Sequence, residues 1–552
     1  MLPVAITSGG GFQGAAFLRC LVGQPGIKTV LLDCYADNVN RYWADSFHIV
    51  PPVKDEEDFI AAVAGIIRSE GVRAVFPSSD YELDVLARNR DRLATAGALV
   101  AASPPHLLRV LRDKKALYAA LKDLSFPVVP MVDLSDGDIP FPLLGKPLSG
   151  WGGRGMRLLR TAADLGASDR ASLMCDYVWQ PFFEDFSEYS ADFAIDFEGR
   201  ISPAVLRKRV RVSGGFAVIA DSHESARIAA SLAGFARLMA ERGGRGVFNV
   251  QVIEPEAGDF FYSDVNPRIG TSSVFSLGAG INLPLFVCRS IEPGVGRDVQ
   301  AVSRPLRMLR RLEERYINRL DPGDVAGVVF DLDDTLIDHK SWILAKSELT
   351  WAQLSHRLPD RHTFMRIVLR FVEEGPRNLL LDAVIKALNL PPELREPLIE
   401  TYRKAMPGSV HSYSDVAPCL AALKAAGLRL ALLTDNPQPG QRQKLSLFPY
   451  TSMFDAIVFS REHGGEKPAP KAFVRAADEL CLDRARLMMV GDNLHRDIAG
   501  ALRCGYGWAA WMKRQSSFFG FNFDLFAQYC PAEAQRTLRL ETMNELVYAL
   551  SA

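Results

Sequence analysis

The sequence contains no uninterrupted run of about twenty apolar residues, the length that a membrane-spanning helix needs. Its first residues include no basic leader, and glycines 9–11 interrupt the apolar stretch, so a signal peptide is not predicted. The eight cysteines are scattered, with no C-x-x-C pair and no nearby histidine at zinc-ligand spacing. We therefore expect a cytoplasmic protein with reduced thiols.

An excess of charge of one sign is also missing. The 64 lysines and arginines offset 65 aspartates and glutamates, which leaves a formal net charge of −1. This balance provides no general attraction to nucleic acid or to an anionic membrane. The chain of 552 residues otherwise has an ordinary globular composition, with 48% hydrophobic residues. Its length predicts roughly three to four folding units, and no long internal repeat divides them.

The order of the predicted elements indicates an α/β and α+β protein with several domains. Residues 1–110 alternate short apolar runs with amphipathic stretches, which predicts parallel strands with crossover helices. Residues 111–190 contain two probable strands joined by a glycine-rich turn. Further strand-like runs follow in residues 191–320, and an arginine-rich stretch at 304–319 predicts a basic helix beside a domain boundary. Residues 321–552 return to α/β alternation.

Polar side chains follow several strands of this last region. Asp331 and Asp333 come directly after a buried-strand pattern, at the sheet edge where open α/β folds place their sites. In an extended backbone the two carboxylates point the same way, and like charges so close need a cation or a shared proton. Thr434 and Asp492 also stand at strand ends, and Lys467 lies between them in sequence.

Taken in order over residues 325–510, these motifs resemble the haloacid dehalogenase superfamily of phosphatases. The motifs are DxDxT, a strand-end threonine, a lysine followed by proline, and GDNLHRD. The resemblance implies a Rossmann-like core with a helical cap at about 339–410. It implies that Asp331 is the nucleophile and Asp333 the acid and base, while Thr434 and Lys467 hold the phosphoryl oxygens. The Mg²⁺ ligands that it implies are Asp331, the Asp333 carbonyl and Asp492, with Asp497 in support.

The N-terminal half carries cations and oxygen ligands beside glycine-rich loops. Lys146 ends a predicted strand, and the glycine-rich loop after it can close over a triphosphate. Asp264 and Asn266 are two residues apart on one predicted strand and therefore face one way. With Arg268 next to them, they favour a site for Mg²⁺ and phosphate.

The motifs of residues 1 to about 300 resemble, in order, the ATP-grasp superfamily, above all its carbamoyl-phosphate-synthase-type and carboxylate–amine ligase branches. They are SGGGFQG, PSSDYEL, DK, the GKP strand with its flap, EYSAD and NPR. The resemblance implies a fold of three lobes that uses ATP and Mg²⁺. The residues that it places around ATP are Lys114, Lys146, Gly152, Gly153, Gly155, Gln180 and Glu188. The Mg²⁺ ligands that it implies are Gln251, Asp264 and Asn266, and Arg268 would steady the transferred phosphoryl group. Asp264 stands where the family often has Glu, so the metal geometry is expected to differ.

Arg207, Arg209 and Arg211 alternate along one predicted strand and would share one face of the sheet. Two interpretations fit them equally. They could bind a carboxylate or phosphate, or they could belong to a solvated edge strand, where charges are favoured.

Together the two resemblances predict a bifunctional enzyme. One part would be an ADP-forming carboxylate–amine ligase with an acyl phosphate intermediate, and the other a Mg²⁺-dependent phosphomonoester hydrolase. The expected partners are a small-molecule carboxylate, an amine and a phosphate ester, without nucleic acid or membrane, and a homo-oligomer is possible. The alternative is a phosphatase regulated by a nucleotide-sensing N-terminal module.

Overall fold

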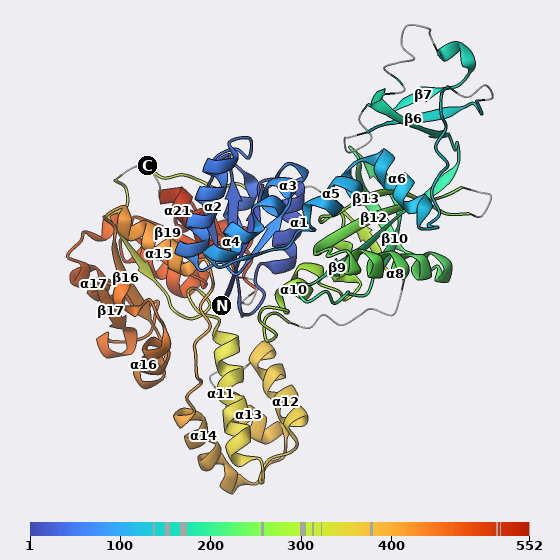
Figure 1. The fold of residues 1–552 in the computed structure, drawn as a ribbon. Coiled ribbons are helices and arrows are strands. Elements are labelled where there is room, and N and C mark those ends of the chain that lie inside the picture. Colours follow the sequence, from blue (N-terminus) through green and yellow to red (C-terminus); the bar gives the residue numbers. More distant parts are fainter. Residues whose placement is uncertain are drawn as a thin grey trace. The chain divides into compact units, whose positions relative to one another are not determined.

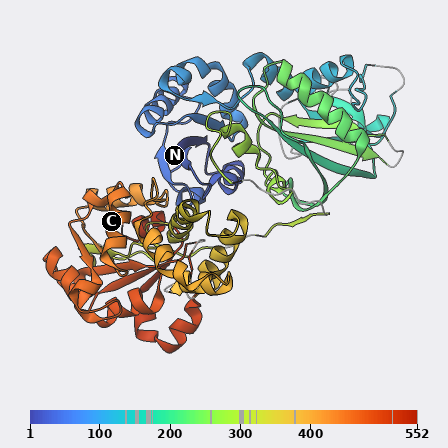
Figure 2. The same ribbon diagram turned by 90° about the horizontal axis from the view of Figure 1, so that it is seen from below.

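The computed structural model describes residues 1–550 apart from 136–138, 149–154, 166–172, 174, 256–258, 298–304, 312–313, 322, 376–378, 515–516 and 519. Contacts divide the chain into two compact units, Met1–Glu314 and Arg315–Ala552, whose elements are drawn in Figure 1 and Figure 2. Both units mix helices and strands, as predicted. Within the described chain, no helix has the length and apolar character needed to cross a membrane.

The N-terminal unit begins with a five-stranded parallel sheet in the order β3-β2-β1-β4-β5. Its central strand β1 buries Val4, Ala5 and Ile6 completely, as expected for a parallel strand that helices cover on both faces. The strands are β1 (Leu2–Thr7), β2 (Ile27–Asp33), β3 (Ser46–Ile49), β4 (Ala74–Pro77) and β5 (Leu99–Val100). The helices are α1 (Phe12–Leu21), α2 (Glu56–Glu70), α3 (Asp80–Arg88), α4 (Arg90–Ala96) and α5 (Pro105–Arg112).

Two antiparallel sheets complete this unit. The smaller has the order β7-β6-β8, and α6 (Lys114–Asp123) precedes it. The larger has six strands in the order β13-β12-β9-β10-β11-β14. The strands are β6 (Leu143–Pro147), β7 (Arg157–Leu159), β8 (Tyr177–Pro181), β9 (Phe186–Ile195), β10 (Val205–Ser213), β11 (Phe216–Ser222), β12 (Gly246–Pro255), β13 (Phe261–Asn266) and β14 (Arg307–Leu309). The remaining helices are α8 (Ala226–Glu241), α9 (Phe275–Gly278) and α10 (Leu283–Cys288).

Two predictions about this unit were wrong. The arginine-rich stretch forms no helix in its described part: residues 307–309 are strand β14, which pairs with β11, and Arg307 binds Asp221 with two hydrogen bonds of 2.7 Å. Strand β10, which carries the alternating arginines, is not an edge strand, because β9 and β11 flank it. A register shift between Arg209 and Arg211 also breaks the strict alternation that the prediction assumed.

The C-terminal unit is built on a six-stranded parallel sheet in the order β17-β16-β15-β18-β19-β20. Apolar clusters cover both of its faces, one with α15 and α21 and the other with α17 and α18. The strands are β15 (Gly327–Phe330), β16 (Arg429–Thr434), β17 (Ala456–Phe459), β18 (Leu487–Gly491), β19 (Trp508–Met512) and β20 (Thr537–Leu540). The helices of this core are α15 (Val416–Ala425), α16 (Gln438–Leu447), α17 (Pro470–Leu480), α18 (Gly500–Arg503), α19 (Phe523–Tyr529), α20 (Pro531–Ala534) and α21 (Met543–Leu550).

A helical bundle is inserted between β15 and β16, at the position where the sequence predicts a cap. Its helices are α11 (His339–Leu354), α12 (Arg361–Glu374), α13 (Leu380–Ala387) and α14 (Arg395–Lys404), which gather together in Figure 1. The bundle has an apolar core of its own around Phe364, Val368 and Val384. A separate core means that the bundle packs as a subdomain and not as a loop of the sheet.

Candidate active sites

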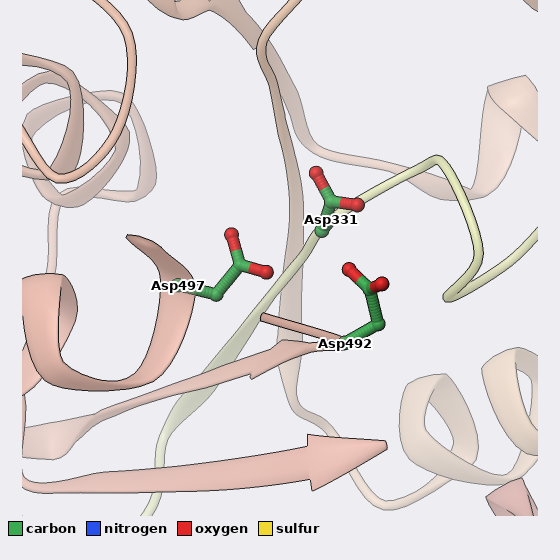
Figure 3. A group of neighbouring side chains, drawn as sticks. All are labelled: Asp331, Asp492 and Asp497. Carbon is green, nitrogen blue, oxygen red and sulfur yellow. The ribbon is translucent and has the colours of Figure 1, made fainter. Parts of the chain in front are cut away.

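Three carboxylates meet at the carboxyl ends of β15 and β18. Asp331 follows β15, Asp492 follows β18, and Asp497 lies in the short π-helix η8 (Leu494–Ala499). An oxygen from each lies within 4.8 Å of the others, and Figure 3 shows the three side chains pointing into one shared space. All three residues are buried.

Lys467 neutralises only part of this charge. Its Nζ lies 2.6 Å from Asp331 Oδ1 and 2.6 Å from Asp497 Oδ1. Burial raises the pKa of Asp331 to about 8, although Lys467 opposes the shift. Burial also raises the pKa of Asp492 well above its usual value, and the neighbouring carboxylates add to that effect.

When all three acids are ionised, three negative charges face one ammonium and leave an excess of two. A divalent cation with hard oxygen ligands, such as Mg²⁺, would neutralise this excess. The donor set therefore fits Mg²⁺, with Asp331 and Asp492 as predicted ligands. The third acid of the group is Asp497, for which the sequence predicts a supporting role.

Asp333 has different partners from Asp331. Its carboxylate accepts hydrogen bonds from Lys444 Nζ at 2.6 and 2.7 Å, and His339 Nδ1 lies 2.9 Å away. Two side-chain amides complete the ring of donors, Asn436 Nδ2 at 2.8 Å and Gln441 Nε2 at 3.0 Å.

The partners of Asp333 determine its charge. Burial opposes its ionisation, but the charges and hydrogen bonds of His339 and Lys444 outweigh that effect and hold the pKa of Asp333 well below its usual value. Among the described residues, Asp331 and Asp333 have different hydrogen-bond partners, but the charge of Asp333 also contributes to the raised pKa of Asp331.

Thr434 and Asp435 connect β16 to this site. Thr434 ends the strand, is buried, and accepts a hydrogen bond from Gln441 Nε2 at 2.5 Å. Asp435 accepts hydrogen bonds from Ser460 Oγ at 2.6 Å and from the Lys467 backbone N–H at 2.9 Å. The acid next to Thr434 therefore fixes the loop that carries Lys467.

Lys444, Gln441 and His339 were not predicted from the sequence. The sequence does place Gln441 and Lys444 three residues apart, and therefore on one face of the helix that follows Thr434, and the structure shows that this face is buried. Polar residues that a helix buries on one face are unusual unless they have partners.

A surface hollow elsewhere in this unit does not belong to the site. Trp508 and Thr537, the first residues of β19 and β20, contribute to its lining. It thus lies at the amino ends of parallel strands, whereas the acids lie at the carboxyl ends.

In the N-terminal unit, one face of the six-stranded sheet is polar. Opposed residues in antiparallel strands point to the same face, and Gln251 of β12 opposes both Asp264 of β13 and Ser190 of β9. The predicted pairing of these two strands is therefore present. Asn266 Nδ2 lies 3.4 Å from Asp264 Oδ2, so the two residues do face one way.

The opposite face of that sheet is apolar. Phe193 of β9, Phe248 of β12 and Phe235 of α8 belong to one core cluster that the helix covers. The polar face is therefore the one that remains for a ligand.

Lys146 lies next to this polar face. Its Nζ donates to Tyr118 Oη at 3.1 Å and to the Ser263 carbonyl at 3.4 Å. Burial lowers the pKa of Lys146 to about 8, while Asp264 acts to raise it and Lys114 to lower it further. The structure thus brings together two predicted ATP-binding lysines and a predicted metal ligand. One carboxylate and two amide oxygens, from Asp264, Asn266 and Gln251, fit a Mg²⁺ ion that phosphate oxygens also coordinate.

The other residues predicted around ATP have internal partners. Gln180 Nε2 donates to the Val129 carbonyl at 3.1 Å, and Glu188 forms an ion pair with Arg209. Gly155 has a φ of 75°, which favours glycine. Gly152 and Gly153, predicted in the same loop, lie outside the described residues.

Arg268 and Arg207 are both buried and paired. Arg268 binds Asp80 through Nε at 2.9 Å and Nη2 at 2.6 Å. Arg207 forms an ion pair with the fully buried Asp192 and donates to Ser272 Oγ at 3.0 Å. The solvated-edge interpretation is therefore wrong for Arg207, whose guanidinium binds a carboxylate within the protein.

The glycine-rich loop after β1 is held by polar residues that the sequence analysis left without a role. Asp33, at the end of β2, accepts a hydrogen bond from the Gly10 N–H at 2.7 Å. Asn40 Nδ2 donates to the carbonyl of Gly9 at 2.6 Å and to that of Gly11 at 2.9 Å. These bonds fix the loop that opens α1.

Comparison with known proteins finds a family match in each of the two units. Residues 328–510 match the sequence model of the haloacid dehalogenase-like hydrolases, and residues 4–101 match that of the PylC-like N-terminal domain. The chain is 30% identical over 193 residues to the glyceraldehyde 3-phosphate phosphatase of Methanopyrus kandleri, which covers 33% of this chain and 81% of that protein. Through its C-terminal unit the chain belongs to the haloacid dehalogenase-like hydrolases.

Two other relatives are similar over parts of the same unit. The glyceraldehyde 3-phosphate phosphatase of Pyrococcus abyssi is 29% identical over 184 residues, or 32% of this chain and 77% of that protein. The N-acylneuraminate-9-phosphatase of Mus musculus is 38% identical over 100 residues, or 18% of this chain and 40% of that protein.

Solved structures with partial similarity include two nucleotide-bound enzymes. The biotin carboxylase domain of Hydrogenobacter thermophilus 2-oxoglutarate carboxylase gives a TM-score of 0.44 at 15% identity, over 54% of this chain and 72% of that one. The N5-carboxyaminoimidazole synthetase of Staphylococcus aureus gives a TM-score of 0.42 at 16% identity, over 52% of this chain and 76% of that one. The two family matches confirm the resemblances predicted from sequence, an ATP-grasp-like unit followed by a haloacid dehalogenase-like phosphatase unit.

Proposed function

We propose that the protein is a bifunctional enzyme. Its C-terminal unit would hydrolyse a phosphate monoester through an aspartyl phosphate, and its N-terminal unit would join a carboxylate to an amine with ATP, through an acyl phosphate. The observation that carries the phosphatase part of the proposal is the group of three buried acids, Asp331, Asp492 and Asp497, beside the single ammonium of Lys467.

In the C-terminal unit, Asp331 attacks the phosphorus atom of the ester. Lys467, 2.6 Å from Asp331, holds a phosphoryl oxygen, and the Thr434 hydroxyl at the neighbouring strand end holds another. Asp331 and Asp492 would hold Mg²⁺, which would supply positive charge to offset the repulsion between the phosphate and a carboxylate. The backbone carbonyl of Asp333 is the third protein ligand that we propose for Mg²⁺.

Asp333 transfers the protons. It protonates the leaving oxygen and then takes a proton from the water that attacks the aspartyl phosphate. Its partners Lys444 and His339 favour the ionised form, which suits the second of these steps.

In the N-terminal unit, Lys114 and Lys146 bind ATP phosphates beside the polar face of the large sheet. Asp264, Asn266 and Gln251 would hold Mg²⁺, which supplies neutralisation of the phosphate charge. Arg268 is positioned by Asp80 to steady the transferred phosphoryl group. We propose that Gln180 and Glu188 lie at the adenine and ribose of ATP. Gly152, Gly153 and Gly155 are proposed to lie over its phosphates.

The names of the relatives support a substrate class for the phosphatase. Glyceraldehyde 3-phosphate and an N-acylneuraminate 9-phosphate, which those names print, are both phosphorylated carbon-chain compounds with further oxygen groups. We propose a small compound of this type for this chain. If it is also a ligase reactant or product, the fusion of the two units would serve consecutive steps.

The test measures phosphate release and ADP release separately on panels of phosphate esters, carboxylates and amines. We expect Asp331→Asn to abolish phosphate release from esters and Lys146→Ala to abolish amine-dependent ADP release. ATP binding without amine-dependent ADP release would contradict a ligase and favour a nucleotide-sensing module. A second measurement tests whether the two units act on the same compound. If they do, the Asp331→Asn variant alone should accumulate a phosphorylated product or leave a phosphorylated reactant unconsumed.

A further inference from the structure

Lys346 is a buried cation without an acidic partner. It lies on α11 of the helical bundle and is 5% exposed. Its Nζ donates to Gln443 Oε1 at 2.8 Å and to the Arg403 carbonyl at 3.3 Å. Within the part of the chain that the structure describes, no carboxylate forms an ion pair with it. An ammonium has three N–H donors, so one remains for a ligand.

The surroundings of Lys346 suit a charged ligand. The ring centres of Tyr402 and Trp342 lie 5.1 and 5.9 Å from its Nζ, where aromatic faces favour a cation. Burial lowers the pKa of Lys346 to about 8, and the charge of Lys444 contributes to this shift. Burying a cation without an anion is costly, so an anionic ligand next to Lys346 would be favoured.

Lys346 is connected to the candidate phosphatase site through two helices. On α11 it lies seven residues after His339, which is 2.9 Å from Asp333. On α16 its partner Gln443 is adjacent to Lys444, which binds Asp333 directly. The lysines therefore continue from Asp333 outward between the bundle and α16. Asp333 is also the residue next to which the leaving group of the substrate must lie.

We propose that Lys346 binds a second anionic group, carried by the leaving-group part of the phosphate ester. This inference rests on the proposed phosphatase function of the C-terminal unit. Lys346 would then determine specificity, because its contact selects esters that carry the second anion and takes no part in the chemical steps.

The helix sets the size of such a substrate. Seven residues of α-helix rise about 10 Å, so the second anion lies roughly that far from the Asp333 carboxylate. An extended carbon chain spans about 1.2 Å per bond, so roughly eight bonds cover this distance. A six-carbon sugar acid phosphate has this length.

Three probe esters with the same carbon chain test the proposal. 6-Phosphogluconate carries a carboxylate at the far end, glucitol 1,6-bisphosphate carries a phosphate, and glucitol 6-phosphate carries a neutral hydroxyl. With the full-length protein and Mg²⁺ we expect kcat/KM for at least one of the two esters with a second anionic group to exceed that for glucitol 6-phosphate by about ten- to hundredfold. The first two arms distinguish a carboxylate from a phosphate.

Lys346→Met should remove this preference and leave kcat/KM for glucitol 6-phosphate within twofold, while Lys346→Arg should retain part of it. Lys386→Met, which changes an exposed lysine of α13, is the matched control and should change neither value. Equal loss on all three esters in Lys346→Met would indicate a structural role only and overturn the proposal. So would equal kcat/KM values for the three esters in the unaltered protein.

Binding separates this inference from the proposed function. Calorimetry on the Asp331→Asn variant needs no turnover, and we expect it to detect tighter binding of an ester with a second anionic group, a difference that Lys346→Met abolishes. If no ester at all is hydrolysed but this binding difference is present, the proposed phosphatase function fails and the anion site stands. If esters are hydrolysed without a binding difference, the anion site fails alone.

Discussion

The guanidinium of Arg268 and the carboxylate of Asp80 form a two-armed ion pair across 188 residues of sequence, with distances of 2.9 and 2.6 Å. Asp80 begins α3, which follows strand β4 of the parallel sheet, and Arg268 follows β13, the last of the strands that carry the proposed metal ligands. The pair thus links the first sheet of the N-terminal unit to its proposed catalytic face.

Asp80→Asn should therefore affect the proposed ligase although Asp80 is not a proposed ATP or metal ligand. The change leaves the nearly buried Arg268 without its counter-charge, and we expect a loss of about 1–3 kcal/mol in the free energy of unfolding of the N-terminal unit. Amine-dependent ADP release should fall as the guanidinium loses its orientation. Denaturant unfolding and coupled ADP assays measure the two effects. Asp37→Asn, at an exposed aspartate of the same unit, should change neither.

Lys444→Met should destabilise the C-terminal unit in a pH-dependent way. Lys444 helps to keep the pKa of Asp333 well below its usual value, so its contribution to stability is present above the unfolded pKa of about 3.9 and is lost as the pH falls below it. We expect a cost of about 3 kcal/mol at pH 7 that is retained down to about pH 4 and shrinks towards about pH 2. Urea unfolding at these pH values measures it, and a pH-independent cost would contradict the charge argument. Lys471→Met, at an exposed lysine, is the control.

Asp492→Asn should change stability with opposite signs in the absence and presence of Mg²⁺. Burial and the neighbouring acids raise the pKa of Asp492, so its ionised form costs stability at neutral pH, by about 1.4 kcal/mol for each tenfold weakening of the acid. In EDTA the variant should therefore be at least as stable as the unaltered protein. With Mg²⁺ the unaltered protein should gain in melting temperature and the variant should gain little. A variant that is less stable in EDTA, or that gains equally from Mg²⁺, would show that Asp492 is not part of a metal site.

Arg207 and Asp192 should show strong coupling in a double-mutant cycle. Arg207→Met leaves Asp192 buried without its counter-charge and should cost about 3–5 kcal/mol in the free energy of unfolding. Adding Asp192→Asn should restore part of that loss, because the charge left without a partner is then removed as well. Arg211→Met, at an exposed arginine of the same strand, should cost little. Additive costs for the pair would mean that the two side chains do not interact.

The strand-end residues were the most predictable part of the molecule. Asp331, Thr434 and Asp492 each follow an apolar run, and parallel strands bring their carboxyl ends to one edge, so pattern alone places these residues together. The common direction of Asp264 and Asn266 was equally accessible, because the two residues lie two positions apart on one strand.

What the sequence did not reveal depends on contacts between distant elements. Lys444 reaches Asp333 across 111 residues and Asp80 reaches Arg268 across 188, and no local pattern encodes such pairs. The arginine-rich stretch misled for a related reason. Its helical spacing is a local property, but its described strand is set by pairing with β11, whose Asp221 binds Arg307.

The contact between His339 and Asp333 also limits how this phosphatase unit can be re-engineered. The bundle α11–α14 has its own apolar core and enters and leaves the sheet at neighbouring strands, so it is a natural module to exchange for a new substrate range. Yet its first residue touches the proposed proton-transfer group. A graft that starts after His339 would keep that contact, whereas one that starts at Asp338 would exchange part of the catalytic machinery together with the specificity.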